Sequence, residues 1–327
     1  VRYPYGCIEQ TTSAVFPQLY LKEFLHGIIN AEAAETDIDE NINLGIRRLR
    51  RFQTPSGAFV YWAGNTTPSA WGTVYAGHFI LEADDLGYHV PHDLMNRWLR
   101  YVKSQALVTR DNLLVRVYRV YLLALANQPE MGAMNLLREN NLKDMTDPER
   151  WMLAAAYHLS GADQTAEQIL DDTGMDVPKY DDYGITYGSG LRDRAIILTM
   201  ALQMDRRDIA DELALEIGQQ VSSRTWYSTQ TTGYCLLALG KYVWELEKDS
   251  DRERKLIGTI RLPDGKEVRF NTADLAYNLE LNSGFGEEIA ITLDQDSNLE
   301  KAFVTLNWNG IPLKSVASYI RFHSEKS

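Results

Sequence analysis

Two residue types with complementary chemistry stand close together near the start of this chain. Cys7, one of only two cysteines in 327 residues, precedes Gln10 by three positions. In the first turn of a helix such residues are neighbours on one face, so a thiol and a carboxamide can meet there. The helix start also supplies unpaired backbone N–H groups and the positive end of the helix dipole, which favour a thiolate and an oxyanion. Attack of the thiolate on the amide carbon, with loss of ammonia, would give an internal thioester.

Such a thioester places two demands on its surroundings. A glutamine amide is a poor electrophile in water, so only a held geometry supplies enough effective concentration for the attack. The product is a stored acylating agent, and its lifetime depends on keeping water away. Tyr3 and Tyr5, which flank Pro4 just before the cysteine, are therefore the candidate shield.

The same residues allow other interpretations. Cys7 can be a small buried hydrophobic residue, with Gln10 an ordinary helix residue. Cys7 can also be the nucleophile of a hydrolase, which needs a histidine partner, but no motif singles out one of the six histidines. For Glu9, between the two, the residues suggest a structural role as an acceptor of backbone N–H bonds at the helix start.

From about residue 9 to residue 245, apolar residues recur at three- and four-residue spacings, which predicts helices. Helices must therefore position Cys7 and Gln10. Asp147 is the expected N-cap of one helix, with Pro148 in its first turn, and Gly87 and Gly161 are expected helix stops. Eleven or twelve helices are predicted; the segments lie near 9–28, 38–53, 71–86, 92–107, 112–126, 130–140, 147–159, 163–172, 190–204, 207–221 and 228–246.

Two loops punctuate this array in a similar way, each placing Gly or Ser and an aromatic residue before an apolar helix, at 53–62 and at 224–230. Repeated helix pairs of this kind indicate stacked hairpins, in an open solenoid or a closed ring. A closed α/α toroid suits eleven or twelve helices, because closure buries both terminal hairpins without polar caps. The predicted fold class is therefore mainly α.

The last part of the chain has a different pattern. After the charged run EKDSDRERK, alternating apolar residues predict strands at 256–262, 267–270, 276–281, 289–293 and 303–308, with turn signals between them. We expect a helical domain at 1–250 and a small antiparallel β-rich segment at 251–327, whose short strands would leave exposed edges unless a longer parent protein adds strands to it. The sequence opens on Val1 with no signal-like segment, which suggests an excerpt of a longer protein.

Charge and metal-ligand patterns exclude several classes of function. A net charge of -12 and a pI near 5.0 argue against nucleic acid as a partner. The arginines of run 47–51 spread around a helix, as expected for a solvated or domain-contacting face. No Cys/His cluster has zinc spacing, and the acidic runs 82–85 and 171–172 lack the spacing of a magnesium motif and are expected on exposed faces. Neither a metal nor a cofactor is predicted.

Several stretches resemble one family. Gly6-Cys7-Ile8-Glu9-Gln10 resembles the thioester motif of the α2-macroglobulin and complement family, and the preceding Tyr3-Pro4-Tyr5 resembles its bacterial form. Gly57-Ala58-Phe59 leading to Trp71-Gly72-Thr73 is similar to that family's Gly-x-Phe loop and the helix after it. The segment Trp226 to Leu239 is similar to its late Trp-x-Ser-Thr-Gln helix, so the resemblance covers residues 1–245.

The resemblance implies a thioester domain with the α/α toroid of terpenoid cyclases and prenyltransferases, and a CUB-like β segment. Cys7 would supply the sulfur and Gln10 the acyl carbon, with Glu9 as the motif neighbour. The parent protein would be a protease inhibitor that traps attacking proteases covalently through their surface amines, once per molecule, rather than an enzyme. The resemblance also implies contacts with other domains of that parent, and a periplasmic or cell-envelope location, with a membrane anchor on the parent.

Two features refine these expectations. Some complement proteins carry a downstream histidine that directs the thioester to hydroxyl groups, but the corresponding loop here, 109–113, has none. Direct attack by amines is therefore expected. The alternatives are an α/α-toroid enzyme of the terpenoid-cyclase or prenyltransferase type, and an interaction module whose Cys7 is merely packed.

Overall fold

A computed structural model describes residues 6–21, 31–181, 184, 186–223, 225–248, 255–272, 277, 279, 288–297 and 304. The chain divides into two units, Val1–Asp249 and Ser250–Ser327. The first unit is helical, and the second contains three strands. The elements of the first unit are α1 (Ile8–Val15), the 3-10 turn η1 (Pro17–Tyr20), α3 (Ala31–Leu49), α4 (Ala70–Asp85), α5 (His92–Ser104), α6 (Leu113–Leu125), α7 (Met131–Asn141), the 3-10 turn η2 (Leu142–Asp144), α8 (Asp147–Leu159), α9 (Asp163–Leu170), α10 (Gly190–Gln203), α11 (Arg207–Val221) and α12 (Thr229–Lys248).

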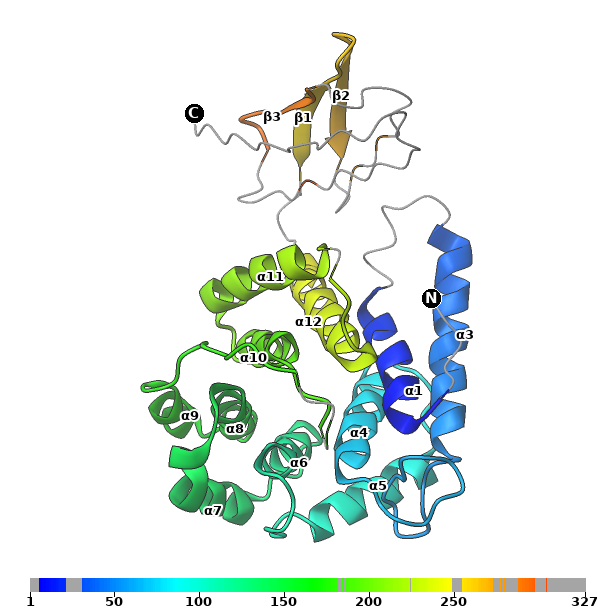
Figure 1. The fold of residues 1–327 in the computed structure, drawn as a ribbon, viewed down its shortest axis with the longest axis vertical. Helices are drawn as coiled ribbons and strands as arrows, with labels where there is room; N and C mark the ends of the chain where they lie inside the picture. The colour runs from blue at the N-terminus through cyan, green and yellow to red at the C-terminus, as the bar shows by residue number, and fades with distance from the viewer. Residues whose placement is uncertain are drawn as a thin grey trace. The chain divides into compact units, whose positions relative to one another are not determined.

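The helices of the first unit form a closed ring of inner helices with others outside it (Figure 1). The inner helices are α1, α4, α6, α8, α10 and α12; each contacts the next, and α12 contacts α1. The helices α3, α5, α7, α9 and α11 pack on the outside of this ring. This arrangement is an α/α toroid, and the mainly helical fold predicted from the periodicity is confirmed.

Residue burial explains which helices lie inside. The inner helix α4 is buried along most of its length, whereas the outer helix α5 buries only Leu94, Met95, Trp98 and Val102, on one stripe. The two helices approach closely at Gly77, where an added β-carbon would lie 2.1 Å from the ring of Trp98. A helix that is apolar on most sides needs neighbours all round, and the ring supplies them.

The inner helices begin with side-chain caps, which each stabilise a helix by about 1 kcal/mol. Ser69, Asn112 and Ser189 accept hydrogen bonds from backbone N–H groups of α4, α6 and α10. The predicted stops are confirmed, because Gly87 and Gly161 follow the ends of α4 and α8 with φ of +86° and +76°. Glycine adopts this left-handed conformation without steric cost.

The start of α8 corrects one prediction. The N-cap is Thr146, and Asp147 is the first helical residue rather than the cap. The carboxylate of Glu149 accepts the backbone N–H of Thr146 at 2.8 Å and its hydroxyl at 2.9 Å. A capping box needs Glu or Gln three positions after the cap. Asp147 has Arg150 at that position, so Thr146 takes the role.

The first helix is shorter than the sequence suggested. A helix was expected over 9–28, but α1 ends at Val15 and the chain continues into the 3-10 turn η1, which begins at Pro17. Proline has no N–H to donate, and its ring collides with the carbonyl four residues earlier, so the α-helical pattern stops there. Residues 22–28 of the predicted segment lie outside the described part of the chain.

The second unit contains a three-stranded antiparallel sheet in the order β2-β1-β3. Its strands are β1 (Leu256–Arg261), β2 (Glu267–Thr272) and β3 (Ala290–Leu293). Thr259 pairs with Arg269 on one side and with Thr292 on the other. The predicted strands at 256–262, 267–270 and 289–293 are confirmed, and those at 276–281 and 303–308 fall on residues of which only 277, 279 and 304 are described.

Candidate functional site

Cys7 and Gln10 meet at the start of α1. Cys7 is the N-cap of this helix, and its sulfur accepts the backbone N–H of Gln10 at 3.5 Å. In return, the side-chain Oε1 of Gln10 accepts the backbone N–H of Cys7 at 3.3 Å. These two bonds form a capping box in which Cys takes the place of Ser or Thr. The side chain of Cys7 is only 2% exposed.

Two neighbours fix this turn. Gly6 has a φ of +94°, and an added β-carbon would lie 2.1 Å from Oε1 of Gln10, so the glutamine side chain folds back over a position that only glycine allows. Arg48 of α3 donates to the carbonyl oxygen of Gly6 at 2.9 Å and to Oγ1 of Thr11 at 3.2 Å. The prediction that run 47–51 is wholly solvated or faces another domain is therefore wrong at Arg48.

Glu9 lies beside the sulfur and is 5% exposed. Its Oε2 is 4.0 Å from Sγ of Cys7, within reach of a hydrogen bond from the thiol. Its Oε1 accepts the hydroxyl of Ser13 at 2.9 Å, and the hydroxyl of Thr229 lies 3.1 Å from Oε1 and 3.3 Å from Oε2. Burial raises the pKa of the Glu9 carboxyl, although the two hydroxyl groups act in the opposite direction.

A pair of tyrosines approaches the sulfur from another direction. The carbonyl of Tyr61 accepts the backbone N–H of Ile8 at 3.1 Å, which ties the 53–68 loop to the start of α1. Burial and hydrogen bonds to Cys7 and Tyr187 raise the pKa of the Tyr61 hydroxyl. The rings of Tyr61 and Tyr187 stack at 6.2 Å, with their hydroxyl oxygens 2.6 Å apart. The predicted shield residues Tyr3 and Tyr5 lie outside the described residues.

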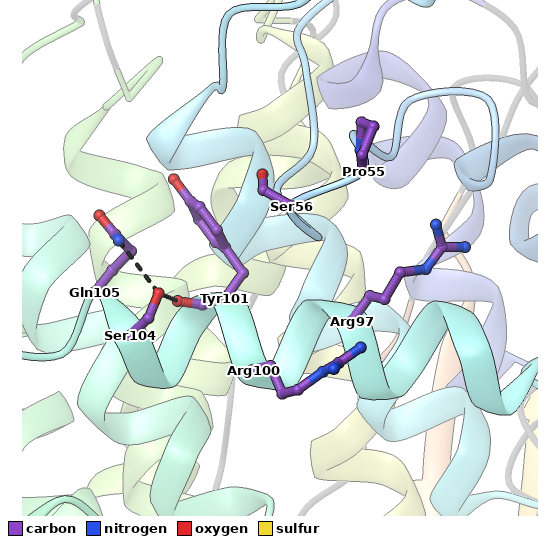
Figure 2. A pocket seen from close by; sticks show the side chains of 7 residues that line it. All are labelled: Pro55, Ser56, Arg97, Arg100, Tyr101, Ser104 and Gln105. Atoms are coloured by element: carbon purple, nitrogen blue, oxygen red, sulfur yellow. Dashed lines mark hydrogen bonds between the residues drawn. The ribbon is translucent and has the colours of Figure 1, made fainter.

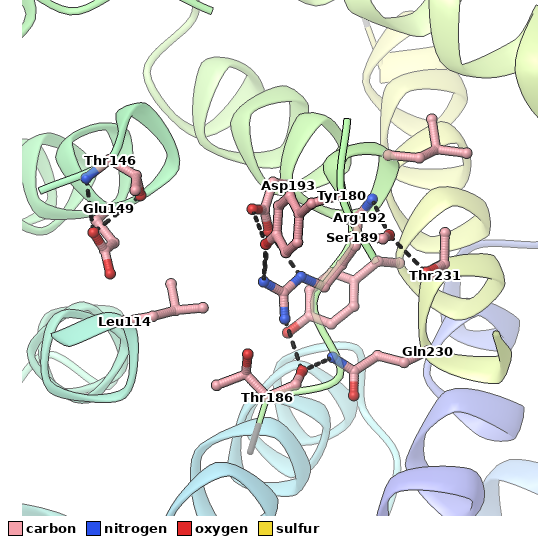
Figure 3. Close-up of polar contacts among 12 residues, drawn as sticks. Leu114, Thr146, Glu149, Tyr180, Thr186, Ser189, Arg192, Asp193, Gln230 and Thr231 are labelled. Carbon is pink, nitrogen blue, oxygen red and sulfur yellow. Dashed lines mark hydrogen bonds and ion pairs between the residues drawn. The ribbon is translucent and has the colours of Figure 1, made fainter. Parts of the chain in front are cut away.

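Tyr187 is held by the residue before it. Its φ is +50°, an uncommon value for a bulky side chain. The carbonyl oxygen of Thr186 accepts two hydrogen bonds, one from Arg192 at 2.8 Å and one from Gln230 at 2.6 Å, as Figure 3 shows. Arg192, 1% exposed, pairs with the carboxylate of Asp193. This pair of donors fixes the backbone immediately before the strained residue.

The segments that motivated the family resemblance converge on α1. Within the 228–230 stretch at the start of α12, Ser228 accepts the N–H of Thr231, Thr229 binds Glu9, and Gln230 accepts the indole N–H of Trp71 at 3.0 Å. A β-carbon at Gly72 would lie 2.8 Å from Ile8. The starts of α4 and α12 therefore enclose the start of α1, which explains why distant segments of the sequence matter to one site.

A second polar cluster lies inside the ring. Glu82 is 6% exposed and contacts His78, Lys241 and Tyr20. Burial alone would raise the pKa of the Glu82 carboxyl, but Lys241 and His78 outweigh it and hold the pKa at about 2. The prediction that run 82–85 lies on an exposed face is wrong for Glu82 and correct for Asp84 and Asp85. The apolar residues on both sides of Glu82 in α4 are the sequence signal that could have predicted its burial.

The space inside the ring is small. A cavity of about 10 Å³ between the inner helices is lined by eight residues: His78, Tyr118, Met152, Ile196, Thr199, Met200, Tyr234 and Leu237. Ligand pockets for small molecules usually measure about 300–1,000 Å³. Within the part of the chain that is described, no group of three or more acidic, His or Cys residues could hold a metal ion. This cavity is therefore far too small to hold the substrate of a toroid enzyme.

A larger open groove, of about 420 Å³, lies between the 53–58 loop and α5 (Figure 2). Its lining residues are Pro55, Ser56, Arg97, Arg100, Tyr101, Ser104 and Gln105. None of them belongs to the surroundings of Cys7. Cys235, the other cysteine, is fully buried in α12, and burial raises the pKa of its thiol to about 12, so it is a core residue. The candidate reactive residues therefore lie at the start of α1.

Comparison with known proteins gives consistent matches. Residues 1–107 match the family model described as the A-macroglobulin TED domain. The alpha-2-macroglobulin of Escherichia coli K12 is 30% identical over 258 residues, which cover 72% of this chain and 15% of that protein. This chain thus spans only a small part of the curated relative.

Solved structures agree with the sequence matches. The native Escherichia coli alpha-2-macroglobulin structure from domain MG7 to the C-terminus superposes with a TM-score of 0.65 at 26% identity, over 83% of this chain and 44% of that one. The Escherichia coli protein activated by porcine elastase gives a TM-score of 0.61 at 26% identity, over 82% and 24%. Among the described residues, no helix has the length and apolar character that crossing a membrane requires.

Proposed function

Because the chain belongs to the bacterial α2-macroglobulin family, as its thioester-domain region with a small β module, we propose that Cys7 and Gln10 form an internal thioester. The observation that carries this proposal is the reciprocal pair of hydrogen bonds between the two residues at the start of α1. The bonds hold the sulfur beside the carboxamide before any reaction. Such positioning supplies the effective concentration that a glutamine amide needs.

The same turn favours the transition state. Attack of sulfur on Cδ of Gln10 places negative charge on Oε1, which already accepts the N–H of Cys7. This backbone donor and the positive end of α1 act as an oxyanion hole. The Sγ–Cδ bond forms, the Cδ–Nε2 bond breaks, and ammonia leaves.

At the level of the whole protein, the proposed function is covalent protease inhibition. An activated thioester would acylate a surface lysine of an attacking protease, so Gln10 becomes an amide and Cys7 a free thiol, once per molecule. In support of this proposal, the similar alpha-2-macroglobulin of Escherichia coli has a solved structure in which it is activated by a protease, porcine elastase. Other domains of a longer parent would supply the protease-sensitive region, and we propose a periplasmic or cell-envelope location with a membrane anchor outside this chain.

Two other functions compete with this proposal. A toroid enzyme needs a substrate cavity, and the cavity of about 10 Å³ inside the ring disfavours it. An interaction module without a thioester would keep the same fold, with Cys7 as a packed N-cap. The two can be told apart by whether Cys7 forms a thioester: the covalent protease inhibitor needs one, and the interaction module has a free thiol.

Intact mass and thiol labelling test the proposal on the full-length protein that contains this chain. We expect a protein lighter by one ammonia, which gains methylamine covalently and exposes one new thiol. Cys235 should stay unlabelled in the native protein, because it is fully buried. A native protein of full mass that gains no methylamine would contradict the thioester, whether or not the buried Cys7 can be alkylated.

A further inference from the structure

We propose that Glu9 is the catalytic base of thioester formation: it takes the thiol proton of Cys7 and returns it to the departing nitrogen of Gln10. This inference rests on the proposed thioester and assigns a chemical role to the residue between its two partners.

The position of the carboxylate supports this role. Sγ of Cys7 lies 4.0 Å from Oε2 of Glu9, so this carboxylate oxygen can accept a hydrogen bond from the thiol. Both groups are buried, at 2% and 5% exposure. A thiol attacks as its thiolate, so a buried acceptor beside the sulfur removes the need for a hydroxide ion from solvent.

The carboxylate is held by hydroxyl groups that come from two helices. Ser13 belongs to α1 itself, four residues after Glu9, and Thr229 is the first residue of α12. The hydroxyl of Ser13 donates to Oε1, and the hydroxyl of Thr229 lies within hydrogen-bond distance of both carboxylate oxygens. These contacts hold the carboxylate beside the sulfur without neutralising its charge.

A contrast within the protein shows why hydroxyl partners suit a base. Another buried carboxylate, Glu82, contacts Lys241 and His78, and its pKa is held at about 2. A group so easily deprotonated is a weak proton acceptor. Burial instead raises the pKa of the Glu9 carboxyl, which makes it a better acceptor near neutral pH.

The step balances without any further reactant. Sγ loses its proton to Oε2 of Glu9 and forms a bond to Cδ of Gln10. The tetrahedral carbon then breaks its bond to Nε2, which takes the proton back from Glu9 and leaves as ammonia. Glu9 is a carboxylate before and after the reaction. The nitrogen that it protonates, Nε2, is bonded to Cδ, the atom that the sulfur attacks.

The test compares Glu9→Gln with Glu149→Gln in the full-length protein. Glutamine has the shape of glutamate and can still accept the hydroxyl groups of Ser13 and Thr229, so the fold should persist. Glu149 is a matched control, because it is also buried, lies in a first helical turn and has a pKa raised by burial, but its carboxylate binds Thr146 (Figure 3). Thermal unfolding checks the fold of both variants.

The readout is the rate at which newly synthesised protein loses one ammonia, followed by intact mass. General base catalysis contributes about 10²- to 10⁴-fold, so we expect Glu9→Gln to form the thioester at least ~10²-fold more slowly and Glu149→Gln to match the wild type. Glu9→Asp, which withdraws the carboxylate from the sulfur but keeps its charge, should also be slower.

The outcomes separate this inference from the thioester proposal. A wild-type protein that never loses ammonia would contradict the proposed function itself. A wild-type protein that forms the thioester, with folded Glu9→Gln or Glu9→Asp forming it equally fast, would overturn only the role of Glu9.

Discussion

The side chain of Gln10 lies directly over the α-carbon of Gly6. A β-carbon built on Gly6 would stand 2.1 Å from Oε1 of Gln10, far inside the contact distance of the two atoms. The backbone of Gly6 is also left-handed, with φ of +94°. The glycine before the cysteine therefore has two separate reasons to be glycine, one of them specific to the glutamine.

These two reasons can be separated by mutation. Gly6→Ala should displace the Gln10 side chain and reduce the fraction of protein that carries a thioester, as measured by intact mass. Gly64→Ala is the control, because Gly64 has φ of +93° but no atom within 4 Å of the added β-carbon. Both variants should lose roughly 1 kcal/mol of stability from backbone strain. Equal thioester content in the two variants would contradict the steric role of Gly6.

Local patterns predicted most of the fold. Apolar periodicity located most of the described helices and strands to within a few residues, since burial of a helix face or strand face leaves a direct record in the sequence. The helix predicted at 38–53 is an exception, because α3 already begins at Ala31. Other errors arose where one residue overrides the pattern. Pro17 ended α1 early, and Thr146 replaced Asp147 as a cap because Glu149 lies three residues after it.

The partners of the site were harder to predict, because hydrogen bonds between distant segments leave no periodic signal. Cys7 and Gln10 could be paired by spacing alone. The contact of Thr229 with Glu9, which is separated from it by 220 positions, depends on closure of the ring from α12 to α1. The turn that presents Tyr187 likewise depends on Arg192, which no motif singled out.

Thr229 offers a test of how Glu9 is positioned. Thr229→Val removes the hydroxyl but keeps the shape, and should slow loss of ammonia from newly made protein, because the carboxylate loses one of its two hydroxyl donors. Thr229→Ser keeps the hydroxyl and should restore the rate. Thr229 is exposed and its hydrogen bond to Glu9 is only partly buried, so its loss should cost about 0.5–1.5 kcal/mol, and unfolding should be followed for both variants. A Val variant as fast as the Ser variant would show that Ser13 alone positions Glu9.

The buried cluster around Glu82 predicts a pH dependence of stability. The folded pKa of Glu82, about 2, lies below the ordinary glutamate value of 4.5, so the charged form stabilises the folded state above about pH 4.5, and this contribution is lost as pH falls towards 2. The pKa difference corresponds to a contribution on the order of 3 kcal/mol. Denaturant titrations from about pH 7 to about pH 3 should show Glu82→Gln less stable than the wild type, with the gap narrowing as the pH falls.

An exposed glutamate provides the control for this measurement. Glu167 contacts Arg206, but its side chain is 54% exposed, and exposed ion pairs contribute only about 0–1 kcal/mol. Glu167→Gln should therefore change stability little at any pH. A gap between the wild type and Glu82→Gln that stays constant with pH would contradict a charged Glu82 in the folded protein.

The stacked tyrosines predict how long a thioester survives in water. Tyr187 stacks on Tyr61, whose carbonyl oxygen accepts the N–H of Ile8 next to Cys7, so Tyr187→Gly should open this side of the site and speed hydrolysis several-fold, seen as gain of one water in intact mass. Glycine also relaxes the left-handed backbone at this position, so a faster loss of thioester would not reflect strain. Tyr187→Phe keeps the stacked ring and should hydrolyse close to the wild-type rate. If both variants hydrolyse equally fast, the hydroxyl contact between Tyr61 and Tyr187, rather than the cover provided by the ring, protects the thioester.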